Sequence, residues 1–180
     1  MEIVYEKITH ENVDVAIKIQ NAIFPGEDGS CNYLDAISEN NNTKSAQCWI
    51  SYFENMPIGV SGVYVYPEHP EDAWLAWYGV LESERGKGYG YQMLCDFEKY
   101  AKNNGYKNIR LYTDEISNKK AIDLYTKFGM TFEKYENEKE SKDMSTVLIF
   151  SKNLAGNKVV PWDNKFLNLT AQFEKEQKTK

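Results

Sequence analysis

The chain has few of the residues that build metal centres and disulfide frameworks. Its 180 residues include only 3 Cys and 2 His. Cys31, Cys48 and Cys95 are odd in number and widely spaced, a pattern that predicts neither a zinc site nor a disulfide scaffold. We therefore expect no bound metal, and a reducing cytoplasm is the simplest compartment for such a chain.

Basic charge and long apolar runs are also scarce. Lys and Arg number 21 against 27 Asp and Glu, so the net charge of −6 argues against a nucleic-acid partner. An acidic chain instead favours cationic small molecules or basic peptides as partners. No run approaches the length of a membrane span, and the N-terminus lacks the basic and apolar segments of a signal peptide. These absences predict a cytoplasmic protein with no membrane partner.

A glycine-rich loop is the strongest local signal that is present. Arg85-Gly86-Lys87-Gly88-Tyr89-Gly90 lies between a strand-like run, residues 74–80, and a helix-like run, residues 91–104. Alternating glycines at a strand-to-helix junction leave backbone N–H groups uncovered, and the helix behind them adds the positive end of its dipole. Two basic side chains add formal charge, so the loop predicts a phosphate site.

The spacing of this loop argues against two common classes of phosphate ligand. It lacks the Gly-Lys-[Ser/Thr] ending of a nucleoside triphosphate loop, and Tyr91 stands where a dinucleotide fingerprint has its third glycine. It does match Arg-x-x-Gly-x-Gly. A second block, residues 118–130, reads Asn-Lys-Lys-Ala-Ile-Asp-Leu-Tyr-Thr-Lys-Phe-Gly-Met.

Together the two blocks resemble the GCN5-related N-acetyltransferase (GNAT) family, whose second block reads Asn-x-x-Ala-x-x-Leu-Tyr-x-x-x-Gly-Phe. Met130 replaces the usual final Phe. The resemblance covers residues 1–152 and implies an N-acetyltransferase that uses acetyl-CoA and acts on a primary amine of a small molecule or peptide. Residues 153–180 fall outside it and are predicted to pack on the domain or to form a dimer contact, which leaves a homodimer open.

Periodicity along the chain predicts a mixed α/β fold. Strands are expected at residues 3–8, 47–54, 58–66, 74–81, 108–113, 130–135 and 144–152, and helices at 9–23, 32–40, 91–104 and 118–128. This order predicts one mostly antiparallel sheet, locally parallel around the glycine loop, with helices on both faces. That architecture agrees with a GNAT-like fold.

The resemblance also implies roles for individual residues. Tyr125 would protonate the leaving thiolate of coenzyme A, and Asn118 would contact the pantetheine arm, although Asn118 also suits a helix N-cap. Backbone N–H and C=O groups of Val80 would bind the pantetheine and polarise the acetyl carbonyl. The pyrophosphate would be held by Arg85, Gly86, Gly88, Tyr89 and Gly90, with Lys87 either touching a phosphate or solvated.

The acceptor side and the general base are less well defined. Many family members carry a Glu on the strand that corresponds to residues 74–80, and this chain has none there. Glu27, Asp28 and Tyr78 are the acceptor-side candidates, the first two being equally suited to an ordinary turn. Carboxylates flanking the expected strands offer further candidate bases: Glu82, Glu84, Asp114 and Glu115. Proton removal through ordered water is equally compatible with this sequence.

Two other functions compete with acetyl transfer. The same fold could serve as a catalytically weak, CoA-binding regulatory module, although retention of both Tyr125 and Asn118 argues against this. An unrelated nucleotide-binding domain is disfavoured by the loop spacing described above.

Overall fold

The computed structural model describes residues 2–37, 47–116, 118–135, 147–163 and 167. The strands are ordered β1-β2-β3-β4-β5-β7-β6 in one seven-stranded mixed sheet flanked by helices, which confirms the predicted fold class. The chain divides into two compact units, residues 1–109 and 110–180. The domain boundary predicted at residue 152 stays a prediction.

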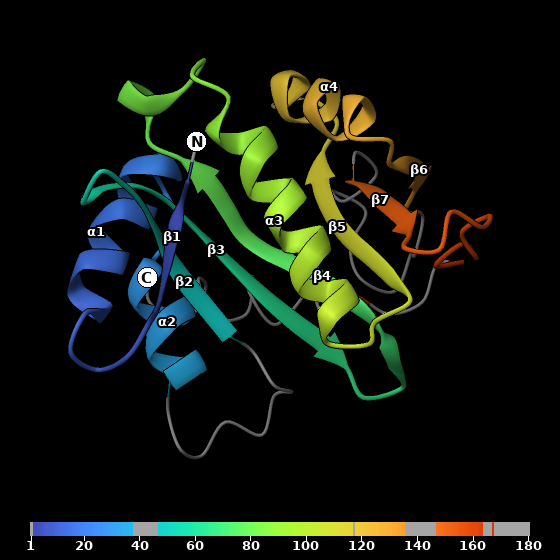
Figure 1. Cartoon of the computed structure of the whole chain (residues 1–180), viewed down its shortest axis with the longest axis horizontal. Coiled ribbons are helices and arrows are strands. Elements are labelled where there is room, and N and C mark those ends of the chain that lie inside the picture. Colours follow the sequence, from blue (N-terminus) through green and yellow to red (C-terminus); the bar gives the residue numbers. More distant parts are fainter. Residues whose placement is uncertain (1, 38–46, 117, 136–146, 164–166, 168–180) are drawn as a thin grey trace. The chain divides into compact units, whose positions relative to one another are not determined.

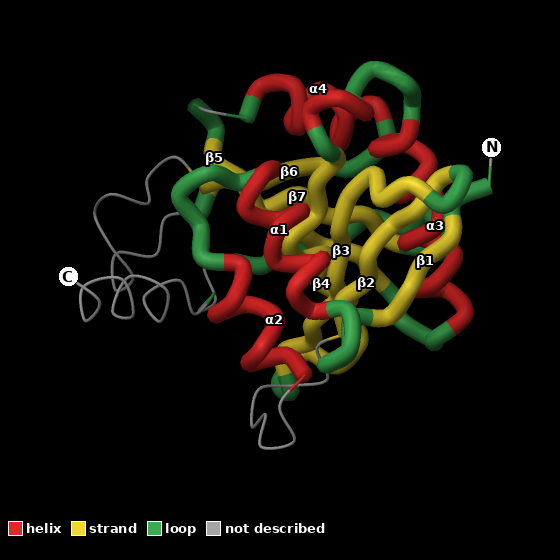
Figure 2. Tube along the Cα trace, turned by 90° about the vertical axis from the view of Figure 1, so that its left-hand side faces the viewer, coloured by secondary structure: helices red, strands yellow, loops and turns green. Residues whose placement is uncertain are grey.

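Unit 1 is built on four antiparallel strands joined in sequence. They are β1 (Val4–Lys7), β2 (Gln47–Phe53), β3 (Met56–Tyr66) and β4 (His69–Val80), each paired with the next. Its helices are α1 (Val13–Ile23), α2 (Gly29–Ile37) and α3 (Tyr89–Asn103), with a short 3-10 turn, η1, at Glu82–Glu84. Figures 1 and 2 show α1 and α2 on one face of these strands and α3 on the other.

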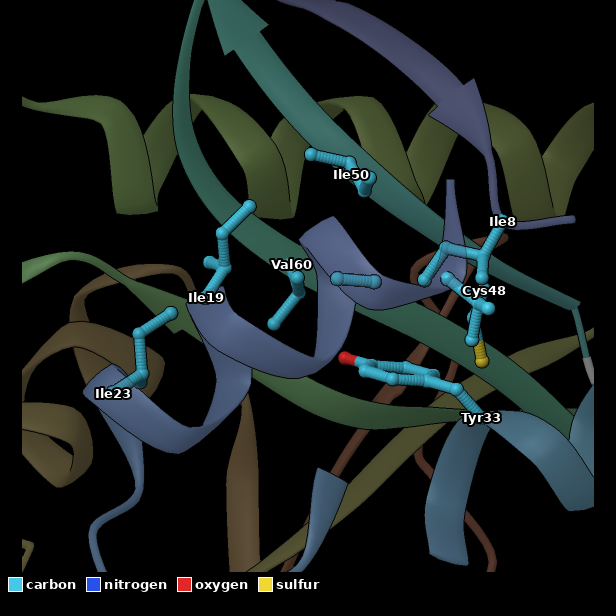
Figure 3. Close-up of a cluster of buried hydrophobic side chains, with 9 residues drawn as sticks. Ile8, Ile19, Ile23, Tyr33, Cys48, Ile50 and Val60 are labelled. Atoms are coloured by element: carbon cyan, nitrogen blue, oxygen red, sulfur yellow. The ribbon is translucent and has the colours of Figure 1, made fainter. Parts of the chain in front are cut away.

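Alternation along β2 explains the two layers of the unit 1 core. Cys48 and Ile50 face α1 and α2, where they join a cluster that includes Tyr33 and Val60 (Figure 3). Trp49, between them, faces the other way, with its ring 5.1 Å from that of Tyr100 on α3. Successive residues of a strand point to opposite faces, so one strand supplies both cores.

Unit 2 contains β5 from Arg110 onward, α4, β6 and β7. The bounds of these elements are β5 (Asn108–Asp114), α4 (Lys119–Lys127), β6 (Thr131–Lys134) and β7 (Val147–Asn153). β6 and β7 pair antiparallel, with Phe132 opposite Phe150. The buried Arg110 donates to Ser151 Oγ at 2.9 Å and to the Val160 carbonyl at 2.8 Å, and it lies over the Trp162 ring. These contacts hold part of the C-terminal stretch within unit 2.

Among the described residues, three elements begin three or more residues away from their expected starts. α1 begins at Val13 rather than near Thr9, because Asn12 Oδ1 accepts the Thr9 N–H and closes a turn there. α2 begins at Gly29, where Asp28 Oδ1 accepts the Ser30 N–H at 2.9 Å. β4 begins at His69 rather than at residue 74. Residues 38–40 of the expected second helix and residues 144–146 of the expected last strand lie outside the described residues.

Candidate functional site

The glycine loop lies at the strand-to-helix junction of unit 1, but α3 begins at Tyr89, so Tyr89 and Gly90 belong to the helix rather than to the loop. Gly86 has φ +79° and Gly88 has φ +87°, and Gly88 is the N-cap of α3. A Cβ at either position would meet no atom within 4 Å. The requirement for glycine is therefore the left-handed backbone rather than a shortage of space.

The N-terminus of α3 has the features of an anion site. Its N-cap makes no side-chain hydrogen bond, and residues 85–88 are exposed. The first N–H groups of a helix lack intrahelical partners, and the helix dipole favours negative charge there. A phosphate therefore fits this end of the helix without further specialisation.

Both basic residues of the loop make contacts of their own. Lys87 Nζ donates to Glu84 Oε2 at 2.9 Å, and this hydrogen bond raises the pKa of the exposed Lys87 ammonium. Arg85 Nε donates to the Val80 carbonyl at 3.1 Å. The Val80 carbonyl expected to bind pantetheine therefore already has a partner within the loop.

The direction of the Val80 N–H follows from the hydrogen bond of the next residue. The next residue, Leu81, donates its N–H to the Ile58 carbonyl of β3 at 2.9 Å. Because N–H direction alternates along an antiparallel strand, the Val80 N–H points away from β3. It is thus directed to the side of β4 opposite β3, the side on which β5 follows in the strand order.

One extra residue in β4 determines which way the side chains just before Val80 point. Val60 pairs with Gly79 and Gly62 with Ala76, so β4 carries one extra residue at this point. Trp77 has φ +45°, a strained conformation for a residue other than glycine. On the other face, Tyr78 Oη donates to the Gly90 carbonyl at 2.5 Å.

That hydrogen bond ties Tyr78 to the first turn of α3. The Tyr78 side chain packs on the cluster that contains Tyr89 and Met93. Tyr78 therefore supports the glycine loop from the α3 face of unit 1, and its proposed contact with the acceptor stays a prediction.

Asn118 occupies the N-cap position of α4, as one of its two expected roles requires. Its backbone carbonyl accepts the N–H groups of Ala121 and Ile122 at 2.9 and 3.0 Å. Its exposed side chain makes no capping hydrogen bond. The side-chain amide is therefore not used for capping, which keeps it compatible with binding a ligand.

Tyr125 lies on the same helix and is buried. Its ring centroid is 5.3 Å from that of Phe150 on β7. Burial raises the pKa of the Tyr125 phenol above its ordinary value, because the phenolate would lose its hydration. The hydroxyl therefore stays protonated at neutral pH, which suits a proton donor and not a base.

The candidate bases mostly serve local structure. Asp28 Oδ1 also accepts the Ser30 hydroxyl, and Asp114 Oδ1 accepts the Ile116 N–H at 2.9 Å. Glu115 Oε2 lies 3.4 Å from Lys134 Nζ. Glu84 pairs with Lys87, as described above. These contacts favour the turn and surface roles and leave the base unassigned.

Three residues close to the candidate site residues were not predicted from the sequence. Trp77 has positive φ at the point where the register between β3 and β4 shifts, and nothing in its local sequence signals that shift. Phe150 and Lys152 contact α4 from β7, a partner more than 20 residues away along the chain. Their alternation on a strand marked them only as residues of one face.

The described residues contain no cluster of His, Cys, Asp and Glu side chains arranged to hold a metal ion. Among the same residues, no helix is long and apolar enough to cross a membrane.

A family model described as the acetyltransferase (GNAT) family matches residues 14–130, which is more than half of the chain. Among curated proteins, none matches.

Solved structures share the fold at low identity. The ribosomal-protein-S18-alanine N-acetyltransferase from Escherichia coli matches with a TM-score of 0.67 and 14% identity, over 92% of this chain and 100% of that one. A GNAT family acetyltransferase from Elizabethkingia anophelis, solved with acetyl-CoA bound, has a TM-score of 0.62 and 18% identity, covering 84% and 97%. An acetyltransferase from Bacillus subtilis, in complex with CoA, has a TM-score of 0.60 and 18% identity over 84% and 97%.

Proposed function

Because this chain belongs to the GNAT family of acetyltransferases, we propose that it transfers an acetyl group from acetyl-CoA to a primary amine of a small molecule or peptide. One observation carries the proposal: the N-terminus of α3 is a left-handed glycine cap without side-chain hydrogen bonds. This end suits a phosphate group, and the two basic side chains beside it add positive charge. Acetyl-CoA supplies the pyrophosphate and the reactive thioester.

The residues of unit 1 bind and orient the cosubstrate in this proposal. Backbone N–H groups of Gly88, Tyr89 and Gly90 would donate hydrogen bonds to the pyrophosphate, and Arg85 would supply positive charge beside it. The Val80 N–H would donate to the acetyl carbonyl oxygen and favour the charge that develops there. The Val80 carbonyl accepts from Arg85 and keeps a second lone pair, with which it would accept from the pantetheine.

The residues of α4 would act on the leaving group. As the amine nitrogen bonds to the acetyl carbon and the carbon–sulfur bond breaks, the sulfur takes up a proton. The Tyr125 hydroxyl carries a proton near pH 7, since a phenol has an ordinary pKa of about 10 and burial raises the pKa of Tyr125 further. The exposed Asn118 amide would contact the pantetheine arm, as the family motif implies.

The acceptor amine must lose a proton before or during attack. A lysine-like amine has a free pKa of about 10.4, so little is reactive near pH 7. The acidic loop containing Glu27 and Asp28 would attract the cationic form, with Asp28 also capping α2. We assign proton removal to water, since the carboxylates described above hold structural partners.

A screen of amines tests the proposal directly. Purified protein with acetyl-CoA and a panel of monoamines, polyamines and peptides would be followed by thiol release, while calorimetry in EDTA measures acetyl-CoA binding without metal. We expect binding in EDTA and thiol release with at least one amine. Binding without turnover across the panel would favour the regulatory module, and no binding at millimolar acetyl-CoA would overturn the proposal.

A further inference from the structure

The C-terminal end of α4 is held by β7 at two points close to Tyr125. Lys152 Nζ donates to the Phe128 carbonyl at 3.1 Å and lies 4.0 Å from the centre of the Phe128 ring. Phe150, two residues earlier on β7, places its ring centroid 5.3 Å from that of Tyr125. Residues two apart on a strand share a face, so one face of β7 makes both contacts.

The helix end itself explains why a cation sits there. Gly129 has φ +85° and donates its N–H to the Thr126 carbonyl at 2.9 Å, while Met130 donates to the Tyr125 carbonyl at 3.1 Å. This is a Schellman ending, which satisfies two of the last carbonyls of the helix. The Phe128 carbonyl lies at the negative end of the helix dipole, where Lys152 supplies a positive charge.

The contacts named here bear on the position of Tyr125. The Schellman hydrogen bond holds its backbone carbonyl, Phe150 packs on its ring, and Lys152 fixes the helix end one turn further on. Phe150 is itself backed by Phe132 on β6, with ring centroids 5.2 Å apart. We expect loss of the Lys152 contact to let the end of α4 move relative to β7 and so to shift the Tyr125 hydroxyl.

We propose that Lys152 is a positioning residue for Tyr125, acting through the Phe128 carbonyl. The inference rests on the proposed function, in which Tyr125 donates the proton to the leaving thiolate. Lys152 itself touches neither cosubstrate nor acceptor in this assignment. A merely structural role predicts a loss of stability that is independent of the Tyr125 hydroxyl, whereas a positioning role predicts a kinetic effect that requires it.

A double-mutant cycle separates these roles. Lys152→Met and Tyr125→Phe would be made singly and together, with acetyl-CoA and an amine that gave turnover in the screen. We expect Lys152→Met to lower kcat about twofold to fivefold with acetyl-CoA affinity unchanged, and to have no further effect on kcat in the Tyr125→Phe background. Equal loss in both backgrounds would overturn the inference.

Two further variants control for charge and folding. Lys127→Met removes the same charge from the last turn of α4 at an exposed position, and we expect parental kcat. Lys152→Arg keeps a cationic donor at the Phe128 carbonyl, and we expect it to retain kcat. Loss in Lys127→Met as large as in Lys152→Met would show a general charge effect and overturn the inference.

A measurement that does not depend on enzymatic turnover tests this inference separately from the proposed function. With 3-fluorotyrosine incorporated at position 125, fluorine NMR reports the surroundings of the ring. We expect the resonance to move in Lys152→Met and to stay in place in Lys127→Met; an unmoved resonance in Lys152→Met overturns positioning. If Tyr125→Phe leaves kcat unchanged, the acid role in the proposed function fails, and the fluorine shift still reports positioning separately.

Discussion

The N-terminus of α3 and the C-terminus of α4 are both formed by a glycine in the left-handed conformation. Gly88 begins α3 at φ +87°, and Gly129 follows α4 at φ +85°. The first helix end is exposed and receives no side-chain cap. The second is closed by its own backbone and by Lys152. A left-handed glycine thus leaves donors available at one helix and satisfies acceptors at the other.

This difference follows from which groups a helix end presents. An N-terminus presents N–H donors, which suit an anionic ligand from outside the chain. A C-terminus presents carbonyls, which a cationic side chain of the same chain can satisfy. We therefore interpret the α3 end as a binding element and the α4 end as a positioning element, and the following predictions test that contrast.

Gly88→Val should have the largest effect, on acetyl-CoA binding. The branched side chain strains the left-handed backbone and covers N–H groups aimed at the pyrophosphate. Charge-assisted hydrogen bonds contribute about 1.5–3 kcal/mol each, so we expect affinity to fall about 100-fold. Calorimetry measures the affinity, and a denaturant midpoint measures stability.

Gly105→Val is the matched control for that variant. Gly105 has φ +79° at the other end of α3, and a Cβ there also meets no atom within 4 Å. It should lose stability similarly and keep acetyl-CoA affinity. Equal affinity in Gly88→Val and the parent would show that the loop is not the phosphate site.

Tyr125→Phe should lower kcat by about 100-fold or less while acetyl-CoA affinity stays near that of the parent. Only the hydroxyl is lost, and the ring that packs on Phe150 is kept. General acids contribute about 10²–10⁴-fold, and a thiolate is a good leaving group, which favours the low end. Steady-state kinetics with chemistry shown to be rate-limiting provides the measurement.

Tyr33→Phe controls for loss of a buried tyrosine hydroxyl. Tyr33 is fully buried and its hydroxyl has no hydrogen-bond partner among the described residues. We expect parental kcat from this variant. A fall in kcat matching that of Tyr125→Phe would assign the effect to burial in general rather than to proton donation.

The pH dependence should distinguish the acid from the acceptor. Burial raises the pKa of Tyr125 above its ordinary value of about 10, so its protonated form persists up to and beyond that pH. The acceptor amine instead gains reactivity as it deprotonates. We expect kcat/KM to rise about tenfold per pH unit between about pH 7 and 9. A falling limb centred below about pH 9 would contradict a buried tyrosine as the acid.

Gly129→Ala should have the smallest effect, mainly on stability. A left-handed conformation costs residues other than glycine about 1–2 kcal/mol, and a denaturant midpoint should show this loss. We expect acetyl-CoA affinity to be unchanged, since the α4 end does not bind the pyrophosphate in our proposal. An affinity loss as large as that of Gly88→Val would remove the distinction between the two helix ends.

Local patterns predicted the elements well. Gly105 and Gly129 follow helices whose apolar spacing was visible in the sequence, and both adopt positive φ. Boundaries were less certain where a side chain competes with the helix, as Asn12 does before α1. The early start of β4 arose because pairing with β3 extends to His69, an interaction between strands that periodicity does not report.

The sequence by itself determined the family, the order of elements and the glycine loop, because these depend on residues close together in the chain. The tertiary structure decided that Arg85 bonds the Val80 carbonyl, that Trp77 is left-handed and that Lys152 meets the end of α4. Such contacts depend on strand register and on packing between distant segments. A shift of one residue along a strand turns every side chain to the other face, so their partners become definite only once the strands have paired.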